Sequence, residues 1–167
     1  PGPVLLDFPM NLQWETIDPQ KMKSFIPDKK NINFNSEILL NIKEKIKKSK
    51  KPLVVAGGGI VHSNSTKEFI NFIEQHNLPC VFSYAAKDIL PFNHKLNCGV
   101  IGQFGNSYSN IILQSSDLII GLGSRFSLRQ TGNNIEGFVS SKETIAVNID
   151  LGELKDGRLN ADIKYEQ

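Results

Sequence analysis

Short runs of apolar residues that stop at glycine or at a polar residue recur along this chain. The clearest are residues 53–56 (LVVA), which run into Gly57, and residues 117–122 (DLIIGL), which run into Gly123. Wholly apolar runs of this length are typical of strands that are buried on both faces of a parallel sheet. Residues 79–82 (PCVF) and 143–150 (ETIAVNID) also read as strands. We therefore predict four strands between residue 53 and residue 150.

The segments between these runs carry apolar residues at helical spacing. A helix from Ser36 to about Ser49 would place four apolar side chains on one face: Ile38, Leu39, Ile42 and Ile46. Residues 65–68 (STKE) have the spacing of a capping box, which predicts that a second helix begins there. Residues 106–115 predict a third helix. Alternating strands and helices indicate βαβ units joined by right-handed crossovers. The predicted fold class is thus α/β, a Rossmann-like parallel sheet covered by helices on both faces.

The first 34 residues differ from the rest. Residues 3–8 (PVLLDF) read as a strand, whereas residues 11–34 are polar, lack a steady period and contain Pro19 and Pro27, which indicates an extended connector. We therefore expect an interdomain strand and connector over residues 1–34 and a Rossmann-like domain over residues 35–167. A chain that opens directly on a strand also reads as a piece of a longer protein.

Charge and composition narrow the function classes. The 167 residues carry a formal net charge of +2, but residues 21–51 hold ten of the 16 lysines. Six of these ten follow the outer face and the C-terminal end of the predicted helix 36–49, where cations are favourable, and no aromatic side chains alternate with them as in a single-strand binding surface. We expect neither nucleic acid nor a membrane as a partner. Two cysteines, Cys80 and Cys98, provide no disulfide framework and fit a reducing cytoplasm.

Glycine clusters at strand ends are the most informative feature for function, since ligands of open α/β sheets bind beyond the carboxyl ends of the strands. Gly57, Gly58 and Gly59 lie between a predicted strand and a helix, where backbone N–H groups could contact a phosphate. The pattern is neither G-x-G-x-x-G nor a P-loop, and a tight turn explains it as well. Both interpretations stay open.

A second cluster, residues 121–125 (GLGSR), repeats this arrangement. Arg125 and Arg129 are two of only three arginines, and they would align if the segment were helical. They suit a phosphate or carboxylate, or else a surface salt bridge. A third cluster, residues 99–105 (GVIGQFG), forms a loop at a sheet edge.

Signals for catalysis are weak. His62, His76 and His94 are scattered, with no carboxylate or cysteine at ligand spacing, and we interpret His94 as structural. Asp88 and Asp150 are isolated carboxylates of the kind that usually serve as hydrogen-bond acceptors. We expect no catalytic residue and no metal site in this chain.

In order along the chain, these segments resemble the central domain of thiamine-diphosphate-dependent enzymes of the acetolactate synthase group. The resemblance covers nearly the whole chain, and its most specific match is residues 117–126 with residues 129–132 (RQTG). The other matching segments are 1–13 (PGPVLLDFPMNLQ), 51–60 (KPLVVAGGGI), 90–94 (LPFNH) with 99–105, and 147–154 (VNIDLGEL).

The resemblance implies that the chemistry belongs to flanking domains. In that family a glutamate of the N-terminal domain activates the thiamine ring, and a Gly-Asp-Gly…Asn motif of the C-terminal domain holds the diphosphate through Mg²⁺. The pair Asp156-Gly157 lacks the preceding glycine, so this chain alone is expected to bind no thiamine diphosphate. The parent protein is expected to be a homodimer or homotetramer that decarboxylates a 2-keto acid such as pyruvate and joins the product to an acceptor carbonyl, with the cofactor as electron sink.

The resemblance also implies positions for FAD, which acetolactate synthases hold in this domain. These positions are Gly57, Gly58, Gly59, Gly102, Gln103, Gly123, Ser124, Arg125 and Arg129. Two family aspartates are replaced by Ser127 and Leu128, and a Met-His pair by Gln103-Phe104, which argues against FAD. The 124–134 segment looks more like acetolactate-synthase-like proteins of surface-polysaccharide or modified-sugar biosynthesis. The alternative hypothesis is a free-standing Rossmann-like module that binds a nucleotide or coenzyme.

Overall fold

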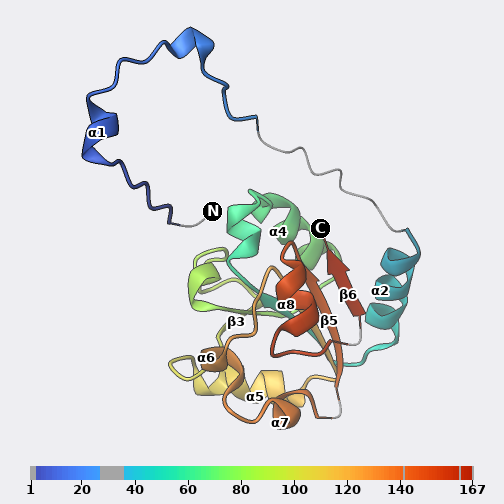
Figure 1. The fold of residues 1–167 in the computed structure, drawn as a ribbon. Helices are drawn as coiled ribbons and strands as arrows, with labels where there is room; N and C mark the ends of the chain where they lie inside the picture. Colours follow the sequence, from blue (N-terminus) through green and yellow to red (C-terminus); the bar gives the residue numbers. More distant parts are fainter. Residues whose placement is uncertain (1–2, 27–35, 141, 162, 167) are drawn as a thin grey trace. The chain divides into compact units, whose positions relative to one another are not determined.

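Six parallel strands form a single sheet in the second of two units into which contacts divide the chain, residues 1–32 and 33–167 (Figure 1). The computed structural model describes residues 3–26, 36–140, 142–161 and 163–166. In the first unit, helix α1 (Met10–Gln13) and the 3₁₀ turn η1 (Pro19–Lys21) interrupt an extended chain whose apolar side chains are exposed. Within residues 3–26 the structure assigns no strand. The strand predicted at residues 3–8 stays a prediction, because a β-strand requires backbone hydrogen bonds to a neighbouring strand.

The strands of the second unit follow the order β3-β2-β1-β4-β5-β6 across the sheet. Their bounds are β1 (Pro52–Ala56), β2 (Cys80–Phe82), β3 (Asn97–Val100), β4 (Leu118–Leu122), β5 (Glu143–Asn148) and β6 (Ile163–Glu166). From β1 the chain adds β2 and then β3 on one side of the sheet. It then crosses to the other side of β1 and adds β4, β5 and β6, so the strand order reverses between β1 and β4. This is the doubly wound arrangement, and it confirms the predicted Rossmann-like α/β fold.

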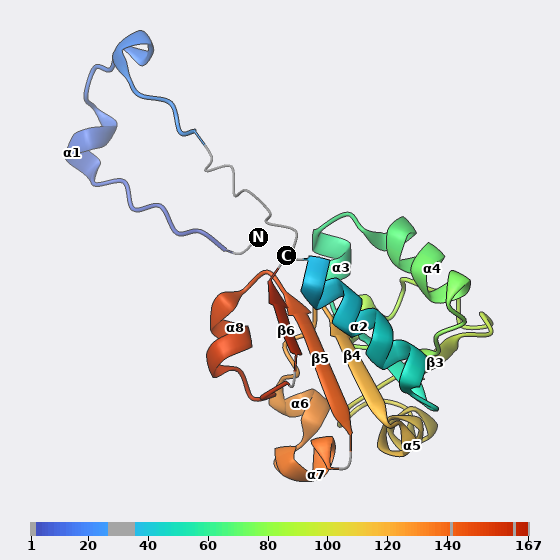
Figure 2. The ribbon, with the colours of Figure 1, turned by 90° about the vertical axis from the view of Figure 1, so that its right-hand side faces the viewer.

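Helices connect the strands and cover the sheet (Figure 2). The longer helices are α2 (Ser36–Lys48), α4 (Thr66–Gln75) and α5 (Ser107–Ser115), as predicted from their apolar spacing. Shorter ones occupy the loops: α3 (Gly59–His62), η2 (Tyr84–Ala86), α6 (Leu128–Thr131), α7 (Ile135–Val139) and α8 (Leu151–Asp156). Of the helices in the described ranges, none has the length and apolar character that crossing a bilayer requires.

Alternating side chains of the central strands build a core on each face. On one face Val54 and Ile120 pack with Ile73 of α4, and Ile42 and Ile46 of α2 close over them. On the other face, side chains of α5, α7 and α8 cover the sheet: Leu113, Phe138 and Leu154. All four residues of the run 53–56 are at most 1% exposed, which explains why their pattern shows no polar position.

One predicted detail is wrong. Ser65 is the N-cap of α4, but its side chain makes no capping hydrogen bond. Its hydroxyl instead contacts the carbonyl of Ser63 at 3.3 Å and the Ser63 hydroxyl at 3.0 Å. The Ser65 hydroxyl is therefore bonded within the preceding turn and does not form the capping box. The cap of α2 lies outside the described residues, as does the predicted boundary at residue 34.

Asp117 stabilises the amino-terminal edge of the sheet through hydrogen bonds. Its carboxylate accepts hydrogen bonds from the Ser49 hydroxyl and from the backbone N–H groups of Lys50, at 2.8 Å, and Lys51, at 3.0 Å. Its backbone carbonyl accepts from Glu143 N at 3.0 Å. Burial alone raises the pKa of this carboxyl, but the hydrogen bonds outweigh burial and lower the pKa below the ordinary 3.8. Asp117 thus joins the starts of three strands: its ionised side chain ties β4 to the segment before β1, and its backbone carbonyl ties β4 to β5.

We predict that Asp117→Asn lowers the free energy of unfolding by about 1–2 kcal/mol at pH 7, because an amide N–H₂ would face a backbone donor. Since the folded state lowers the pKa, the contribution is present above about pH 5 and is lost as the pH falls below about 4. Urea unfolding of both proteins at pH 7 and pH 3 measures this difference. Asp88→Asn, at an exposed carboxylate, is the control. An unchanged difference at pH 3 would contradict the role of the charge.

Candidate functional site

The carboxyl ends of β1 and β4 are joined by direct contact between two glycine turns. A Cβ added to Gly57 would lie 2.1 Å from the Gly123 carbonyl oxygen, and one added to Gly59 would lie 2.7 Å from the Gly123 Cα. Gly123 itself has φ +59°, a conformation that side chains disfavour. Only glycine therefore fits at Gly57, Gly59 and Gly123.

Three N–H groups of these turns already donate hydrogen bonds to backbone carbonyls of the protein. Gly57 N donates to Leu122 O at 2.9 Å, Gly59 N donates to Gly123 O at 3.0 Å, and Gly123 N donates to Val147 O at 2.9 Å. A phosphate cradle requires unpaired N–H groups that point at the ligand. The structure supports the tight-turn interpretation for these glycines. Cofactor contact at Gly57, Gly58, Gly59 and Gly123 stays a prediction.

The loop after β4 places Arg125 at the surface. Phe126 follows it with φ +49°, and its ring, which is 2% exposed, fills the space over Gly121, where a Cβ would lie 2.3 Å from the ring. The ring also meets Phe138 edge-on, with centroids 6.1 Å apart. This aromatic anchor directs the preceding residue outward.

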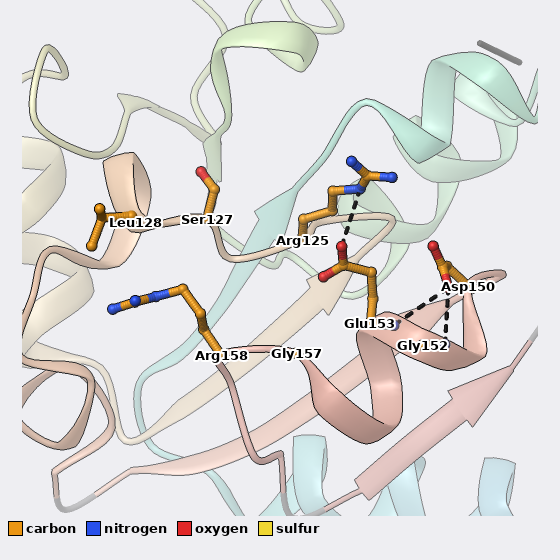
Figure 3. A pocket seen from close by; sticks show the side chains of 8 residues that line it. All are labelled: Arg125, Ser127, Leu128, Asp150, Gly152, Glu153, Gly157 and Arg158. Atoms are coloured by element: carbon orange, nitrogen blue, oxygen red, sulfur yellow. Dashed lines mark hydrogen bonds and ion pairs between the residues drawn. The ribbon is translucent and has the colours of Figure 1, made fainter.

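A first pocket of about 580 Å³ opens beside this loop, between α6 and α8 (Figure 3). Its lining residues are Arg125, Ser127, Leu128, Asp150, Gly152, Glu153, Gly157 and Arg158. Nε of Arg125 pairs with Glu153 Oε1 at 3.4 Å, and the terminal guanidinium nitrogens point away from Glu153. Nη2 of Arg158 donates to Gly132 O at 2.8 Å. Two guanidinium groups thus flank this pocket at the carboxyl edge of the sheet.

Asp150 caps the helix that forms one wall of the first pocket. Its Oδ1 accepts from Gly152 N at 2.9 Å and Glu153 N at 3.4 Å. This bears out the interpretation of Asp150 as a structural hydrogen-bond acceptor, and neither of these two bonds uses Oδ2.

A second pocket of about 500 Å³ lies on the other side of α6. It is lined by Gly102, Gln103, Asn110, Leu113, Gln114, Leu128, Arg129, Gln130, Thr131, Gly132, Asn133 and Phe138. Gly102 has φ +103°, and a Cβ there would lie 2.4 Å from Arg129 O. Gln103 N donates to that same carbonyl at 2.8 Å. The loop after β3 and the α6 segment are therefore joined backbone to backbone.

The residues predicted for one cofactor site fall in different places. Arg125 lines the first pocket, whereas Gly102, Gln103 and Arg129 line the second. Ser124 is 6% exposed, and its hydroxyl accepts from Phe126 N at 3.4 Å. The condition for a helical alignment of Arg125 with Arg129 is not met, because α6 begins at Leu128 with Ser127 as its N-cap.

Three residues of the first pocket were missed from sequence. Asp150 and Glu153 have the spacing of a helix start, which the sequence displays as DLGE, and Arg158 is the third of the rare arginines. The Ser127–Gln130 capping box was likewise legible as SLRQ. These signals could have located the pocket walls.

Other reactive side chains have structural surroundings. Burial, with a smaller effect of Cys98, raises the pKa of the Cys80 thiol to about 12, and burial also raises the pKa of Cys98. His94 Nδ1 accepts from Leu96 N at 3.2 Å while Nε2 contacts Glu74 at 3.1 Å, which fits its structural interpretation. Among the described residues no group of three or more His, Cys, Asp or Glu could hold a metal ion.

We predict that Gly57→Ala lowers the free energy of unfolding by at least about 2 kcal/mol, because the new methyl would press on the backbone of β4's turn. Gly58→Ala is the matched control, since its Cβ would meet side chains and no backbone, Ala85 at 3.1 Å and the His62 ring at 3.8 Å, and its φ of −59° suits alanine. Denaturant unfolding measures both. Equal losses for the two variants would contradict the proposed contact.

Comparison with known proteins agrees with this geometry. The family model described as the thiamine pyrophosphate enzyme central domain matches residues 39–164. A probable acetolactate synthase large subunit of Methanococcus aeolicus is 34% identical over 161 residues, covering 92% of this chain and 26% of the relative. The acetolactate synthase large subunit of Lactococcus lactis is 31% identical over 163 residues, covering 95% of this chain and 28% of the relative.

A relative of another activity also matches. The 3D-(3,5/4)-trihydroxycyclohexane-1,2-dione hydrolase of Geobacillus thermodenitrificans is 38% identical over 104 residues, covering 62% of this chain and 16% of the relative. The chain spans about a quarter of the length of the two acetolactate synthase subunits. A family match over residues 39–164, which include β1 to β5, in the doubly wound fold that the resemblance implies, shows that this chain belongs to the thiamine pyrophosphate enzyme central-domain family.

Proposed function

We propose that this chain is the non-catalytic central domain of an acetolactate-synthase-like enzyme, and that it spaces the two domains that hold thiamine diphosphate and Mg²⁺. The observation that carries the proposal is the 34% identity that covers 92% of this chain but only 26% of the relative. The whole protein would decarboxylate a 2-keto acid such as pyruvate and transfer the product to an acceptor carbonyl. Thiamine diphosphate would supply the electron sink for that reaction.

The residues of this chain do not fit the diphosphate of thiamine. Asp156 ends α8 and Gly157 follows it as the C-cap, where a Cβ would lie 2.1 Å from the Glu153 carbonyl oxygen. The Asp-Gly pair therefore terminates a helix and does not form a loop after a strand. We assign no thiamine or magnesium contact to it.

The first pocket suits a nucleotide better than the Asp156-Gly157 pair suits thiamine diphosphate. Arg125 and Arg158 supply the charge that phosphate groups require, and Asp150 keeps Oδ2 for a ribose hydroxyl. FAD is one nucleotide of this class, but three of its expected contacts, Gly102, Gln103 and Arg129, lie in the second pocket. Leu128 lines both pockets, so a ligand as long as FAD would have to extend across that side chain.

The same pocket also suits the alternative function, a free-standing nucleotide- or coenzyme-binding module. The family match favours the domain of a larger enzyme. We further propose that the parent protein is a homodimer or homotetramer and that it resides in a reducing cytoplasm. The two free cysteines support only the reducing environment.

We predict that the 167-residue chain, mixed with thiamine diphosphate, Mg²⁺ and pyruvate, releases no CO₂ above the protein-free rate, because the resemblance assigns the glutamate that activates the thiamine ring to a flanking domain. The whole parent protein is the positive control and should bind thiamine diphosphate in calorimetry. Turnover by the chain alone would overturn the assignment of a non-catalytic domain. A parent without any thiamine diphosphate binding would overturn the enzyme class.

We predict that the chain binds ADP and that Arg125→Gln and Arg158→Gln each weaken binding by about five- to twentyfold, since each removes a charged phosphate donor. Isothermal titration calorimetry measures the affinity. Lys155→Gln removes an equal charge from the exposed end of α8 and is the control. An equal loss in the control, or no binding of ADP by the unaltered chain, would refute the nucleotide site.

A further inference from the structure

The two neighbouring pockets differ in the chemistry of their walls. The first combines two arginines with the carboxylates of Asp150 and Glu153. The second has a single charged lining residue, Arg129, no carboxylate, and five carboxamides: Gln103, Asn110, Gln114, Gln130 and Asn133. Its volume of about 500 Å³ is within the usual range for small-molecule sites.

Backbone bonds and two of the carboxamides make the frame of the second pocket rigid. The Asn110 amide accepts from Gly102 N at 3.0 Å and donates to Gly102 O at 3.1 Å, so it pairs with that residue as a strand neighbour would. Gln130 Oε1 accepts from Ser127 N at 2.9 Å and fixes the start of α6. Gln103 N is held by Arg129 O. The walls are thus positioned before any ligand arrives, which reduces the entropy cost of binding.

Four lining side chains remain available inside this frame. Gln103, Gln114, Arg129 and Asn133 are exposed or nearly so, and within the described part of the chain their side chains have no hydrogen-bond or ion-pair partner. Arg129 takes part in the frame only through its carbonyl oxygen. Its guanidinium group is therefore free to bind without loosening the walls.

The chemistry of these groups defines a ligand class. A carboxamide donates and accepts at once, which matches hydroxyl groups, and a guanidinium group binds a carboxylate or phosphate through two parallel bonds. Leu113, Leu128 and Phe138 add an apolar part to the lining that suits the C–H face of a carbon skeleton. Since the lining has no carboxylate, nothing there repels an anion. We propose that the second pocket is a binding site for an anionic polyol, a sugar acid or a sugar phosphate.

This site is independent of the proposed nucleotide site, and calorimetry can separate the two. D-gluconate and glucose 6-phosphate are the probes for the two sources of negative charge, a carboxylate and a phosphate. D-glucose has the hydroxyl groups without the charge, and acetate has the charge without the hydroxyl groups. We expect at least one of the two anionic polyols to bind the 167-residue chain at least tenfold more tightly than glucose or acetate. ADP should not displace it.

Matched arginine variants locate the binding. Arg129→Gln should weaken binding of the anionic polyol at least fivefold, whereas Arg125→Gln, which removes the same charge from the first pocket, should leave it within twofold. Asn133→Ala provides a second variant that keeps every charge, and we expect a loss of at least twofold. Thermal unfolding of each variant verifies that the fold is retained.

Four results would overturn the proposal. The first is no binding of either anionic polyol, and the second is binding of acetate as tight as that of gluconate, which would show that hydroxyl groups are not recognised. The third is an equal effect of Arg129→Gln and Arg125→Gln, and the fourth is displacement by ADP; either would place the ligand in the first pocket. Failure of ADP to bind at all would refute the nucleotide site and leave this one standing.

Discussion

The close approach of two backbones at the carboxyl ends of β1 and β4 is the constraint on which the functional edge of this protein depends. Gly57 and Gly59 lie against Gly123 with no room for a side chain between them. The contact falls where the strand order reverses, the place at which the chain connections leave the sheet in opposite directions. Because the two strand ends are held together there, the loops that follow them have fixed starting points.

The opposite edge is fixed by a charge. The carboxylate of Asp117 accepts hydrogen bonds from the two N–H groups just before β1, and its backbone carbonyl accepts one from the first residue of β5. The two ends of the sheet therefore use different chemistry: a carboxylate at the amino edge and glycine packing at the carboxyl edge. Between them, a core on each face supplies most of the stabilisation, since the central strands β1, β2 and β4 are almost completely buried.

The central strands were predictable because burial on both faces leaves a plain apolar run, as in residues 53–56 and 118–120. The edge strands were not. β3 contains Asn97 and Gly99, which are poor strand formers, and β6 alternates with charged residues, so neither carries the pattern of a buried strand. Sheet edges tolerate such residues because one side of each lacks a neighbour.

The candidate site was predictable in part. The glycine turns and the arginines were found at strand ends, but their division between two pockets depends on where α6 begins, and that depends on the Ser127–Gln130 cap. The walls contributed by Asp150, Glu153 and Arg158 come from a distant stretch of sequence that only β5 brings close. No local pattern near Arg125 encodes that proximity.

The reciprocal pairing of Asn110 with Gly102 has an evolutionary consequence. A side chain of α5 takes the place of a neighbouring peptide, so the course of the loop after β3 is specified from outside the loop. Gln103 and Phe104 contribute to that course only through their N–H groups, which Arg129 O and the Tyr84 hydroxyl accept. Mutation can thus replace both exposed side chains while the main chain keeps its path. Ligand preference at this edge can diverge among descendants of one ancestor without a change of scaffold.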